Sequence, residues 1–226
     1  MWEYLSSLAG ELPYILQGSL TTLLVVFFAL GLGLIFGLPL ALGQIYGPLA
    51  LNRLVRIYVW FFRGTPILVL LYLFYFGLFI ALNLDVSAFA SSCIVLGLTS
   101  AAYQSQIFRG ALESLPHGQL KAARALGMSD TEGIRHIILP QALRLSIPGW
   151  SNEYSILLKD SALVHVLGVP ELMARSHYVA SRTTWHFTYY ILAGILYLII
   201  TVLGLRLLRS LETKTRLPGY AALSHE

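Results

Sequence analysis

The chain has 226 residues, of which 57% are hydrophobic and only 12% are charged. A soluble domain usually carries about twice that charged fraction, and apolar stretches of about 20 residues, the length that a bilayer core requires, recur along this chain. The composition excludes an ordinary soluble globule and predicts an all-α integral membrane protein in which residues 1–226 form a single domain. We interpret the net charge of +4 as a signal of membrane orientation and expect no nucleic-acid partner.

Five membrane-spanning helices in a lipid bilayer are expected from the apolar runs. In the first, a stripe of small residues at four-residue spacing begins at Ala29 and ends at Ala41, which predicts close packing against another helix. Two long connections separate the later spans, one over residues 113–140 and one over residues 169–186. The predicted spans cover roughly 14–40, 54–82, 88–112, 141–168 and 187–209.

The distribution of charge predicts the orientation of these spans. Lys and Arg residues gather after the first, third and fifth spans, whereas acids such as Glu11, Asp85 and Glu171 lie at the opposite ends. By the positive-inside rule, the N-terminus lies outside, and the C-terminus and the connection over residues 113–140 lie in the cytoplasm. Arg175 and Arg182 are the exceptions on the outer side.

The connection over residues 113–140 has the signals of two short helices joined by a sharp corner. Good helix formers run from Gln119 to Leu126, and Gly127 is placed to end that helix in the left-handed conformation. Ser129 followed by Glu132 is a capping box, which begins a second helix. From the pattern alone, an amphipathic element on the lipid headgroups and a knob inserted into a partner protein fit equally well. In the second case the contact face would consist of Leu120, Ala123, Leu126 and the small residues between them.

The fourth predicted span is the richest in polar side chains, which in a membrane usually face a cavity or one another. Helical spacing places Asn152, Ser155 and Lys159 on one face, with Glu153 and Asp160 beside it. An amino acid zwitterion needs an acceptor for its ammonium group and a donor for its carboxylate, and this set offers both. The alternative is that Lys159 and Asp160 form a neutralised pair or support a neighbouring helix.

Two further polar residues are candidates for the same path. Gln106 lies beside Ser105 in the third span, and Arg63 precedes a Gly-Thr-Pro sequence that disrupts helical hydrogen bonding. For Arg63, a broken helix that lines the path and an arginine that reaches the inner headgroups both remain open. The serines and histidines have no Gly-x-Ser-x-Gly elbow or oriented base, so the sequence disfavours an intramembrane hydrolase, and we expect no catalytic or metal site.

The stretch "KAARALGMSDTEGIRHIILP" at 121–140 resembles the coupling loop of ABC importer permeases, whose pattern is Glu-Ala-Ala, three residues, Gly, nine residues and Ile-x-Leu-Pro. Ala122, Ala123, Gly127 and the Ile-x-Leu-Pro at 137–140 stand at the matching offsets, whereas Lys121 stands in place of the Glu. Three more stretches are similar to a narrower branch, the permeases for polar amino acids of the histidine/arginine/glutamine type, in which many members have Glu where this chain has Gln106. These are "FRGTP" at 62–66, "AYQSQIFRGALESLPHGQ" at 102–119 and "LPQALRLSIPGWSNEYSILLKDSALV" at 139–164.

The resemblance implies a type I ABC importer permease fold in a bacterial inner membrane, with a cytoplasmic coupling helix that contacts an ATPase subunit. It also implies an extracytoplasmic binding protein, for which Arg175 and Arg182 are the candidate contacts. None of the three lysines follows a Gly, so the chain has no P-loop of its own, and we expect no directly bound cofactor, with ATP and Mg²⁺ on the ATPase partner. The candidate coupling residues are Gly118, Leu120, Lys121, Ala122, Ala123, Leu126, Gly127 and Ser129.

Five spans are too few to enclose a polar path alone, so we expect a pair of permease subunits, identical or related, with two ATPase subunits. The resemblance implies a polar amino acid as substrate, and Glu153 and Asp160 favour a basic one such as arginine, histidine or lysine. Glutamine, glutamate or another polar amino acid or derivative is the alternative. An ion-driven secondary transporter is a remote alternative, because such proteins usually have many more spans and internal repeats, and no repeat is found here.

Overall fold

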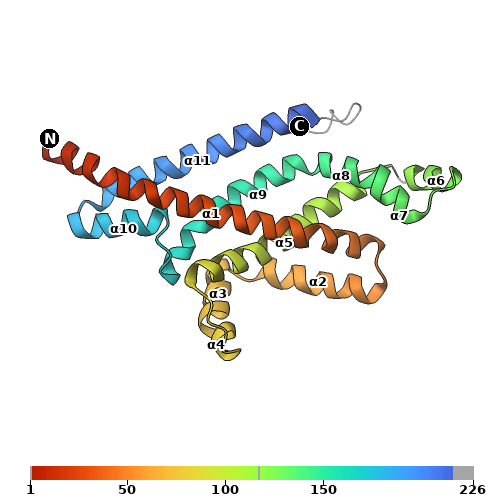
Figure 1. The fold of residues 1–226 in the computed structure, drawn as a ribbon, viewed down its shortest axis with the longest axis horizontal. Coiled ribbons are helices and arrows are strands. Elements are labelled where there is room, and N and C mark those ends of the chain that lie inside the picture. Colours follow the sequence, from red (N-terminus) through yellow and green to blue (C-terminus); the bar gives the residue numbers. More distant parts are fainter. Residues whose placement is uncertain (1, 117, 216–226) are drawn as a thin grey trace.

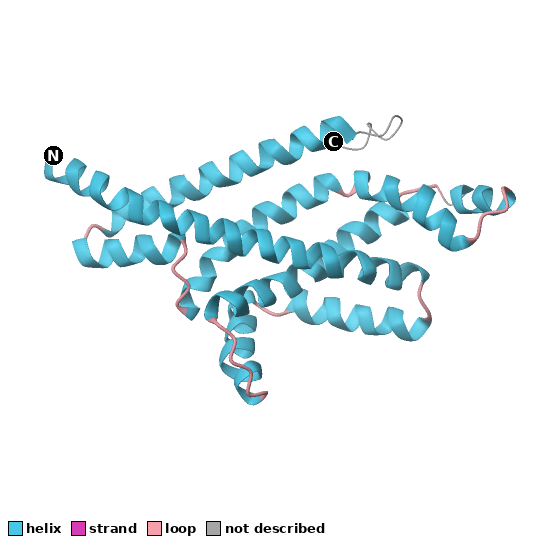
Figure 2. Cartoon of the chain, in the orientation of Figure 1, coloured by secondary structure: helices cyan, strands magenta, loops and turns pink. Residues whose placement is uncertain are grey.

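The computed structural model describes residues 2–116 and 118–215, and every regular element in that part of the chain is a helix (Figure 1, Figure 2). The prediction of an all-α chain is confirmed. The molecule is elongated, and α1 and α11 run along its length (Figure 1). The helices are α1 (Trp2–Tyr46), α2 (Leu49–Gly64), α3 (Ile67–Tyr72), η1 (Leu73–Leu78), α4 (Phe79–Ala81), α5 (Ala88–Glu113), α6 (Gly118–Ala125), α7 (Asp130–Gly133), η2 (Ile134–Ile138), α8 (Leu139–Leu145), α9 (Ile147–Asp160), η3 (Ser161–Leu167), α10 (Leu172–Thr183) and α11 (His186–Thr215).

The centre of the fold is the packing of α1 against α5, and the stripe of small residues in α1 makes it possible. At Gly37 the helices are so close that an added Cβ would lie 3.1 Å from the carbonyl oxygen of Ala101. Ala29 and Ala41, at the two ends of the stripe, are fully buried. The prediction of close helix packing along this stripe is confirmed.

The second predicted span, 54–82, is not one straight helix. α2 ends at Gly64, α3 begins at Ile67, and the two helical segments are bent by 106°. Pro66 has no N–H to continue the helical ladder, and the N–H of Thr65 makes the last bond, to the carbonyl oxygen of Phe61 at 3.1 Å. The predicted disruption at Gly-Thr-Pro is therefore confirmed.

The fourth predicted span, 141–168, is also built from several segments. A continuous helical run from α7 through a π-helical turn, η2, enters α8 and ends at Leu145, and α9 begins at Ile147. Pro140 cannot donate a backbone hydrogen bond, and the wider turn directly before it allows the helix to continue through this position. The predicted start at residue 141 is therefore not a helix boundary.

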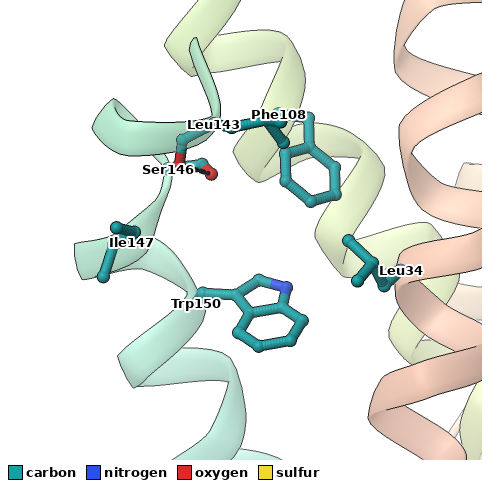
Figure 3. Close-up of a pocket in the computed structure, with 6 residues that line it drawn as sticks. All are labelled: Leu34, Phe108, Leu143, Ser146, Ile147 and Trp150. Atoms are coloured by element: carbon teal, nitrogen blue, oxygen red, sulfur yellow. Dashed lines mark hydrogen bonds between the residues drawn. The ribbon is translucent and has the colours of Figure 1, made fainter. Parts of the chain in front are cut away.

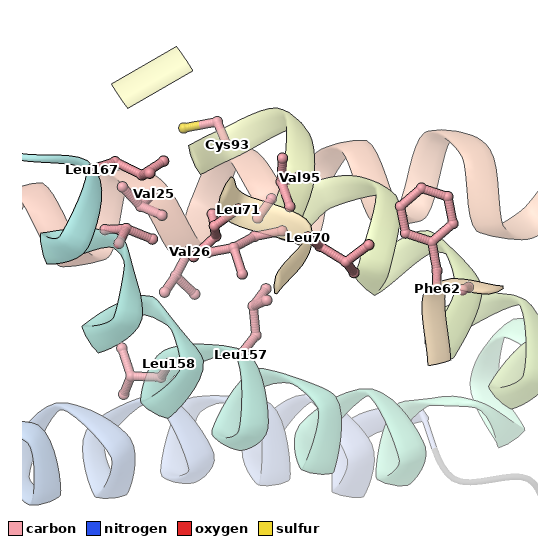
Figure 4. Close-up of a cluster of buried hydrophobic side chains, with 14 of the residues drawn as sticks. Val25, Val26, Phe62, Leu70, Leu71, Cys93, Val95, Leu157, Leu158 and Leu167 are labelled. Carbon is pink, nitrogen blue, oxygen red and sulfur yellow. The ribbon is translucent and has the colours of Figure 1, made fainter. Parts of the chain in front are cut away.

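The hydrophobic core is divided into three clusters along the molecule. The largest lies where α1, α3, α5 and α9 meet (Figure 4), and it includes the fully buried Leu70, Val95 and Leu158. A second cluster, around Phe108 and Ile138, lies between α1, α5 and the run from η2 to α8. A third cluster packs α10 and α11 against α1. Buried apolar side chains thus hold the helices together at both ends of the molecule as well as in its middle.

Large apolar side chains also cover the outside of the molecule, as lipid contact requires; Phe27 is 71% and Trp60 is 75% exposed. Among the described residues, two helices are long and apolar enough to cross a membrane: α1 from Ala9 onward, and α11. A third crossing is present if α2 and the bent segments that follow it, up to Ala81, are taken together as one span. The third and fourth spans coincide with helices that carry more polar side chains, and their crossing of the membrane stays a prediction.

Candidate functional site

The predicted coupling segment forms a sharp corner, which we call the α6–α7 corner (residues 118–133). α6 ends in a Schellman motif: the N–H of Met128 donates to the carbonyl oxygen of Ala123 at 3.1 Å, and that of Gly127 to Arg124 at 3.0 Å. Gly127 has a φ of +80°, a conformation that costs a residue with a Cβ about 1–2 kcal/mol. The predicted helix stop at Gly127 is confirmed.

Charged side chains complete the corner. Ser129 caps α7 with the predicted capping box, in which the Glu132 carboxylate accepts from the Ser129 N–H at 2.8 Å, and this bonding lowers the pKa of Glu132. Across the corner, the Nε and Nη2 of Arg124 donate to the two carboxylate oxygens of Asp130 at 2.6 and 2.8 Å. These hydrogen bonds favour the ionised carboxylate and lower the pKa of Asp130. Hydrogen bonds between residues of the corner itself therefore stabilise its conformation.

The outward surface of the corner differs from the predicted contact face. Ala123 is 1% exposed, and both Leu120 and Ala123 pack on Gly133, where an added Cβ would lie 2.9 Å from Leu120 Cδ1 and 3.2 Å from Ala123 Cβ. Ala123 is therefore turned inward and Leu120 is half-buried, because the short α6 needs these apolar residues to hold it on α7, and their place on the contact face stays a prediction. Leu126, in contrast, is 80% exposed. The other exposed coupling candidates are Gly118, Lys121, Ala122, Gly127 and Ser129.

The corner is attached firmly to the rest of the chain. Gln119 of α6 and Gln141 of α8 exchange two hydrogen bonds, each amide Nε2 donating to the other Oε1 at 3.0 Å. Beneath them, Leu115, Ile138 and Ala142 are buried in one cluster. A displacement of the corner would therefore be passed to α8 instead of being absorbed by a loose connection.

An apolar cavity of about 160 Å³ lies beside the junction of α8 and α9 (Figure 3). In Figure 3, Trp150 extends from α9 toward Leu34 of α1, and its indole N–H donates to Oε1 of Gln104 on α5 at 2.6 Å. The start of α9 is thus tied to α5, and the cavity borders the end of α8. Its lining residues are Leu34, Phe108, Leu143, Ser146, Ile147 and Trp150.

Glu153, a predicted path residue, is turned into the interior and is 3% exposed. Its Oε1 accepts from the Ser100 hydroxyl at 2.7 Å, and Gln104 Nε2 donates both to Ser100 Oγ at 3.0 Å and to the Leu30 carbonyl oxygen at 3.1 Å. This chain of hydrogen bonds joins α9, α5 and α1. Among the described residues, no Lys or Arg lies within 4 Å of the carboxylate.

Asn152 and Ser155, on the other side of α9, face away from Glu153. They line an open groove of about 340 Å³ between α9 and α11, together with Arg209 and Glu212 of α11. In the sequence, Arg209 belongs to the cluster of cations after the fifth predicted span, which indicates only the orientation of the chain. No pattern within α9 signals this meeting of two helices.

Lys159 points away from the other two members of the predicted set, because successive residues of an α-helix point about 100° apart. Glu153 and Asp160, seven residues apart, lie on the same side of α9, and a shared site for them stays a prediction. Lys159 is exposed, and among the described residues neither Lys159 nor Asp160 takes part in an ion pair. The alternative of a neutralised pair is therefore not observed.

The two remaining path candidates lie in other surroundings. Gln106 Nε2 donates to Gln44 Oε1 at 3.0 Å, and Asn52 donates to the carbonyl oxygen of Gln44, so Gln106 belongs to a polar cluster that joins α1, α2 and α5. Arg63 lies at the end of α2 beside the bend, with its guanidinium 4.9 Å from the ring centroid of Tyr103. For both residues, a role in the path stays a prediction.

Arg175 and Arg182, the candidate contacts for a binding protein, both reach toward α1. Arg175 Nη1 donates to Gln17 Oε1 at 3.0 Å, and its guanidinium lies 4.5 Å from the ring centroid of Tyr14. Arg182 forms an ion pair with Glu11. The two arginines therefore clamp α10 onto α1, and their contact with a second protein stays a prediction.

Glu171 is the residue whose role the sequence analysis missed. It is the N-cap of α10 and is fully buried. Its carboxylate accepts from the N–H groups of Met173 at 2.8 Å and Ala174 at 2.5 Å, and from the hydroxyl of Tyr197 at 2.6 Å. Glu171 thus joins α10 to α11, and a signal from one local stretch of sequence could reveal only its capping position.

Comparisons with known proteins place the chain among transport proteins. Residues 29–217 match the family of binding-protein-dependent transport system inner membrane components. The probable amino-acid ABC transporter permease protein YckA of Bacillus subtilis is 37% identical over 199 residues, which cover 87% of this chain and 88% of that protein. The histidine/lysine/arginine/ornithine transport system permease protein HisM of Salmonella typhimurium is 36% identical over 225 residues, 94% of each chain. The octopine transport system permease protein OccQ of Agrobacterium tumefaciens is 35% identical over 211 residues, 88% of this chain and 89% of that protein.

Solved structures agree with this assignment. An amino acid ABC transporter crystallised with histidines superimposes with a TM-score of 0.84 at 31% identity, covering 92% of this chain and 97% of that one. The MetNI methionine ABC transporter, at 22% identity, has a TM-score of 0.71 over 87% of this chain and 95% of that one and shows the same fold. The chain belongs to the binding-protein-dependent transport system inner membrane component family. It is a membrane-spanning subunit of an ABC importer with the type I permease fold, and the ATPase of such an importer is a separate subunit.

Proposed function

We propose that this subunit moves a polar amino acid, and preferentially a basic one, through the bacterial inner membrane in a pair of permease subunits. Two ATPase subunits drive the pair, and an extracytoplasmic binding protein delivers the amino acid. The names of the relatives support an amino acid as substrate, because they include a permease for histidine, lysine, arginine and ornithine. Glutamine, glutamate and other polar amino acids are the alternatives within the same class.

The observation that carries the preference for a basic substrate is the environment of Glu153. A carboxylate in a membrane interior is costly unless it is paired, and it usually marks a substrate or ion pathway. Glu153 has a hydrogen bond from Ser100, and its carboxylate has no Lys or Arg within 4 Å among the described residues. A cationic side chain of a substrate would place a positive charge in direct contact with this carboxylate.

The docking of the ATPase subunits is assigned to the α6–α7 corner. Its exposed Leu126 would enter an apolar pocket of the ATPase, and Lys121 lies nearby on the surface of α6. This assignment requires the N-terminus outside and the C-terminus in the cytoplasm, as the positive-inside rule predicts. ATP and Mg²⁺ would bind only to the ATPase subunits. On the outer side, α10 with Arg175 and Arg182 would meet the binding protein.

The test is transport by the complete importer in proteoliposomes. With ATP inside and the binding protein outside, we expect uptake of L-arginine, L-lysine or L-histidine above that of L-glutamine and L-glutamate. Glu153→Gln should lower the uptake of the basic amino acids at least tenfold while leaving any uptake of L-glutamine nearly unchanged. Glu113→Gln, at a side chain that is 55% exposed, serves as the control. Equal loss for all amino acids in Glu153→Gln would contradict a role in substrate selection.

A further inference from the structure

α9 and α11 run side by side, and a hollow of different character lies on each face of the pair. On one face, Trp150 and Tyr154 of α9 line a cavity of about 300 Å³ together with leucines of α1 and α11, and its walls are almost wholly apolar. On the opposite face lies the groove of about 340 Å³ with Asn152, Ser155, Arg209 and Glu212, which we call the α9–α11 groove. Polar side chains on membrane helices are retained where they face water, a ligand or each other, so the second face requires an explanation.

Of the five polar side chains that line the groove, Ser151 donates to the carbonyl oxygen of Ile147, and the other four do not bind one another. Arg209 and Glu212 are three residues apart on α11, a spacing at which opposite charges often pair. Nevertheless, they form no ion pair within 4 Å, and no hydrogen bond joins the side chains of Asn152, Ser155, Arg209 or Glu212 to any other residue that the structure describes. One cation, one anion and two neutral hydrogen-bonding groups therefore converge on open space.

We propose that the α9–α11 groove is a second amino-acid site, which binds the α-carboxylate through Arg209 and the α-ammonium through Glu212. The planar guanidinium of Arg matches a carboxylate with two parallel hydrogen bonds, and a carboxylate accepts from an ammonium group. Asn152 and Ser155 supply further hydrogen bonds to the ligand. The volume of the groove lies at the lower end of the range of small-molecule pockets, about 300–1,000 Å³.

The site is distinct from Glu153 and lies further along the path. Glu153 faces Ser100 on α5, whereas the groove opens on the other face of α9 and reaches the last turns of α11. Those turns are the end that the positive-inside rule places toward the cytoplasm. The groove therefore binds the transported amino acid on its exit side, by the groups that all amino acids share. This inference rests on the proposed function.

The test is protection of a thiol placed in the groove. Ser155→Cys is introduced into a Cys93→Ala background, since Cys93 is the one cysteine of the chain, and the complete importer in nanodiscs is treated with a maleimide. We expect L-arginine and L-histidine to slow the labelling, and agmatine, which lacks the carboxylate, to leave it unchanged. With Arg209→Gln or Glu212→Gln, the amino acid concentration for half-protection should rise about tenfold to hundredfold. Arg206→Gln, on α11 but outside the groove, should behave as the parent.

Each outcome either supports or overturns the proposal. Absence of protection in the parent, protection that persists in Arg209→Gln and Glu212→Gln, or equal loss in Arg206→Gln would overturn it. An anionic lipid headgroup as the natural occupant would appear as labelling that is slowed by phosphatidylglycerol in the nanodisc and is insensitive to amino acids, which also overturns it. Uptake of amino acids by the same preparation is measured separately. Normal uptake without protection of the thiol would refute the groove site alone. Absence of any amino acid uptake would refute the proposed function.

Discussion

Replacement of Gly127 by valine is expected to disconnect the transporter from its ATPase without unfolding the membrane helices. A Cβ at this position would meet nothing within 4 Å, so the effect arises from the backbone and not from a clash. The left-handed conformation at φ +80° costs about 1–2 kcal/mol for a residue with a Cβ, and a β-branched residue lies at the upper end. This free energy lowers the population of the native corner by a factor of about 5–30.

The assay compares the amount of ATPase subunit that co-purifies with the permease and the ATPase rate that the loaded binding protein stimulates. Gly168→Val is the matched control, because Gly168 has a φ of +88° and open space around it but lies between α9 and α10, away from the corner. Gly127→Asn should retain most of the coupling, since Asn tolerates this conformation. Wild-type coupling in Gly127→Val, or the same loss of ATPase subunit in Gly168→Val, would refute the reasoning.

Three further predictions follow from the hydrogen bonds and packing of the described residues. First, Asp130 and Glu132 have lowered pKa values in the folded corner, so their stabilisation is fully present above the ordinary carboxylate pKa, about 4, and is lost as the pH falls through the lowered values. Protection of the corner amides from hydrogen exchange, corrected for the intrinsic rate, should stay constant from about pH 7 to 5 and fall below about pH 4; a loss near neutral pH would argue against it. Second, Gly33→Ala should destabilise the protein by about 1–3 kcal/mol in thermal unfolding, because the new Cβ would lie 2.2 Å from Gln104 Nε2. Gly31→Ala is the control, since an added Cβ there would meet nothing within 4 Å and should not lower the Tm. Equal Tm values for the two variants would contradict the prediction and show that Gln104 moves freely. Third, Glu171→Gln should cost about 1–3 kcal/mol, since both oxygens of Glu171 accept hydrogen bonds and an amide nitrogen cannot. An unchanged Tm, with exposed Glu113→Gln as control, would contradict this role.

The features that the sequence predicted correctly are encoded within a few neighbouring residues. Gly127 and the capping box at Ser129 define the corner through backbone conformation and local hydrogen bonds, and the break at Pro66 follows from its missing N–H. The bend of 106° at that break was not predictable, because its size depends on how α3 packs against α5 and η3.

The features that were missed depend on contacts between distant parts of the chain. Thr22 lies 149 positions from its partner Glu171, and Gln104 lies 74 positions from the Leu30 carbonyl that it binds. Helical periodicity places residues on a face of their own helix but does not say which helix covers that face. For the same reason helical spacing alone does not reveal that Ala123 packs against Gly133 within the corner.

The central claim is that the α6–α7 corner lies on the inner side of the membrane and touches the ATPase subunit. Leu126→Cys and Phe187→Cys, each in the Cys93→Ala background, place thiols at two positions that are 80% and 81% exposed on predicted opposite sides. In intact cells, a membrane-impermeant maleimide should label Phe187→Cys alone, and in inverted vesicles a bifunctional reagent should join Leu126→Cys to the ATPase subunit. Labelling of Leu126→Cys from outside, or normal transport without any such cross-link, would contradict the account.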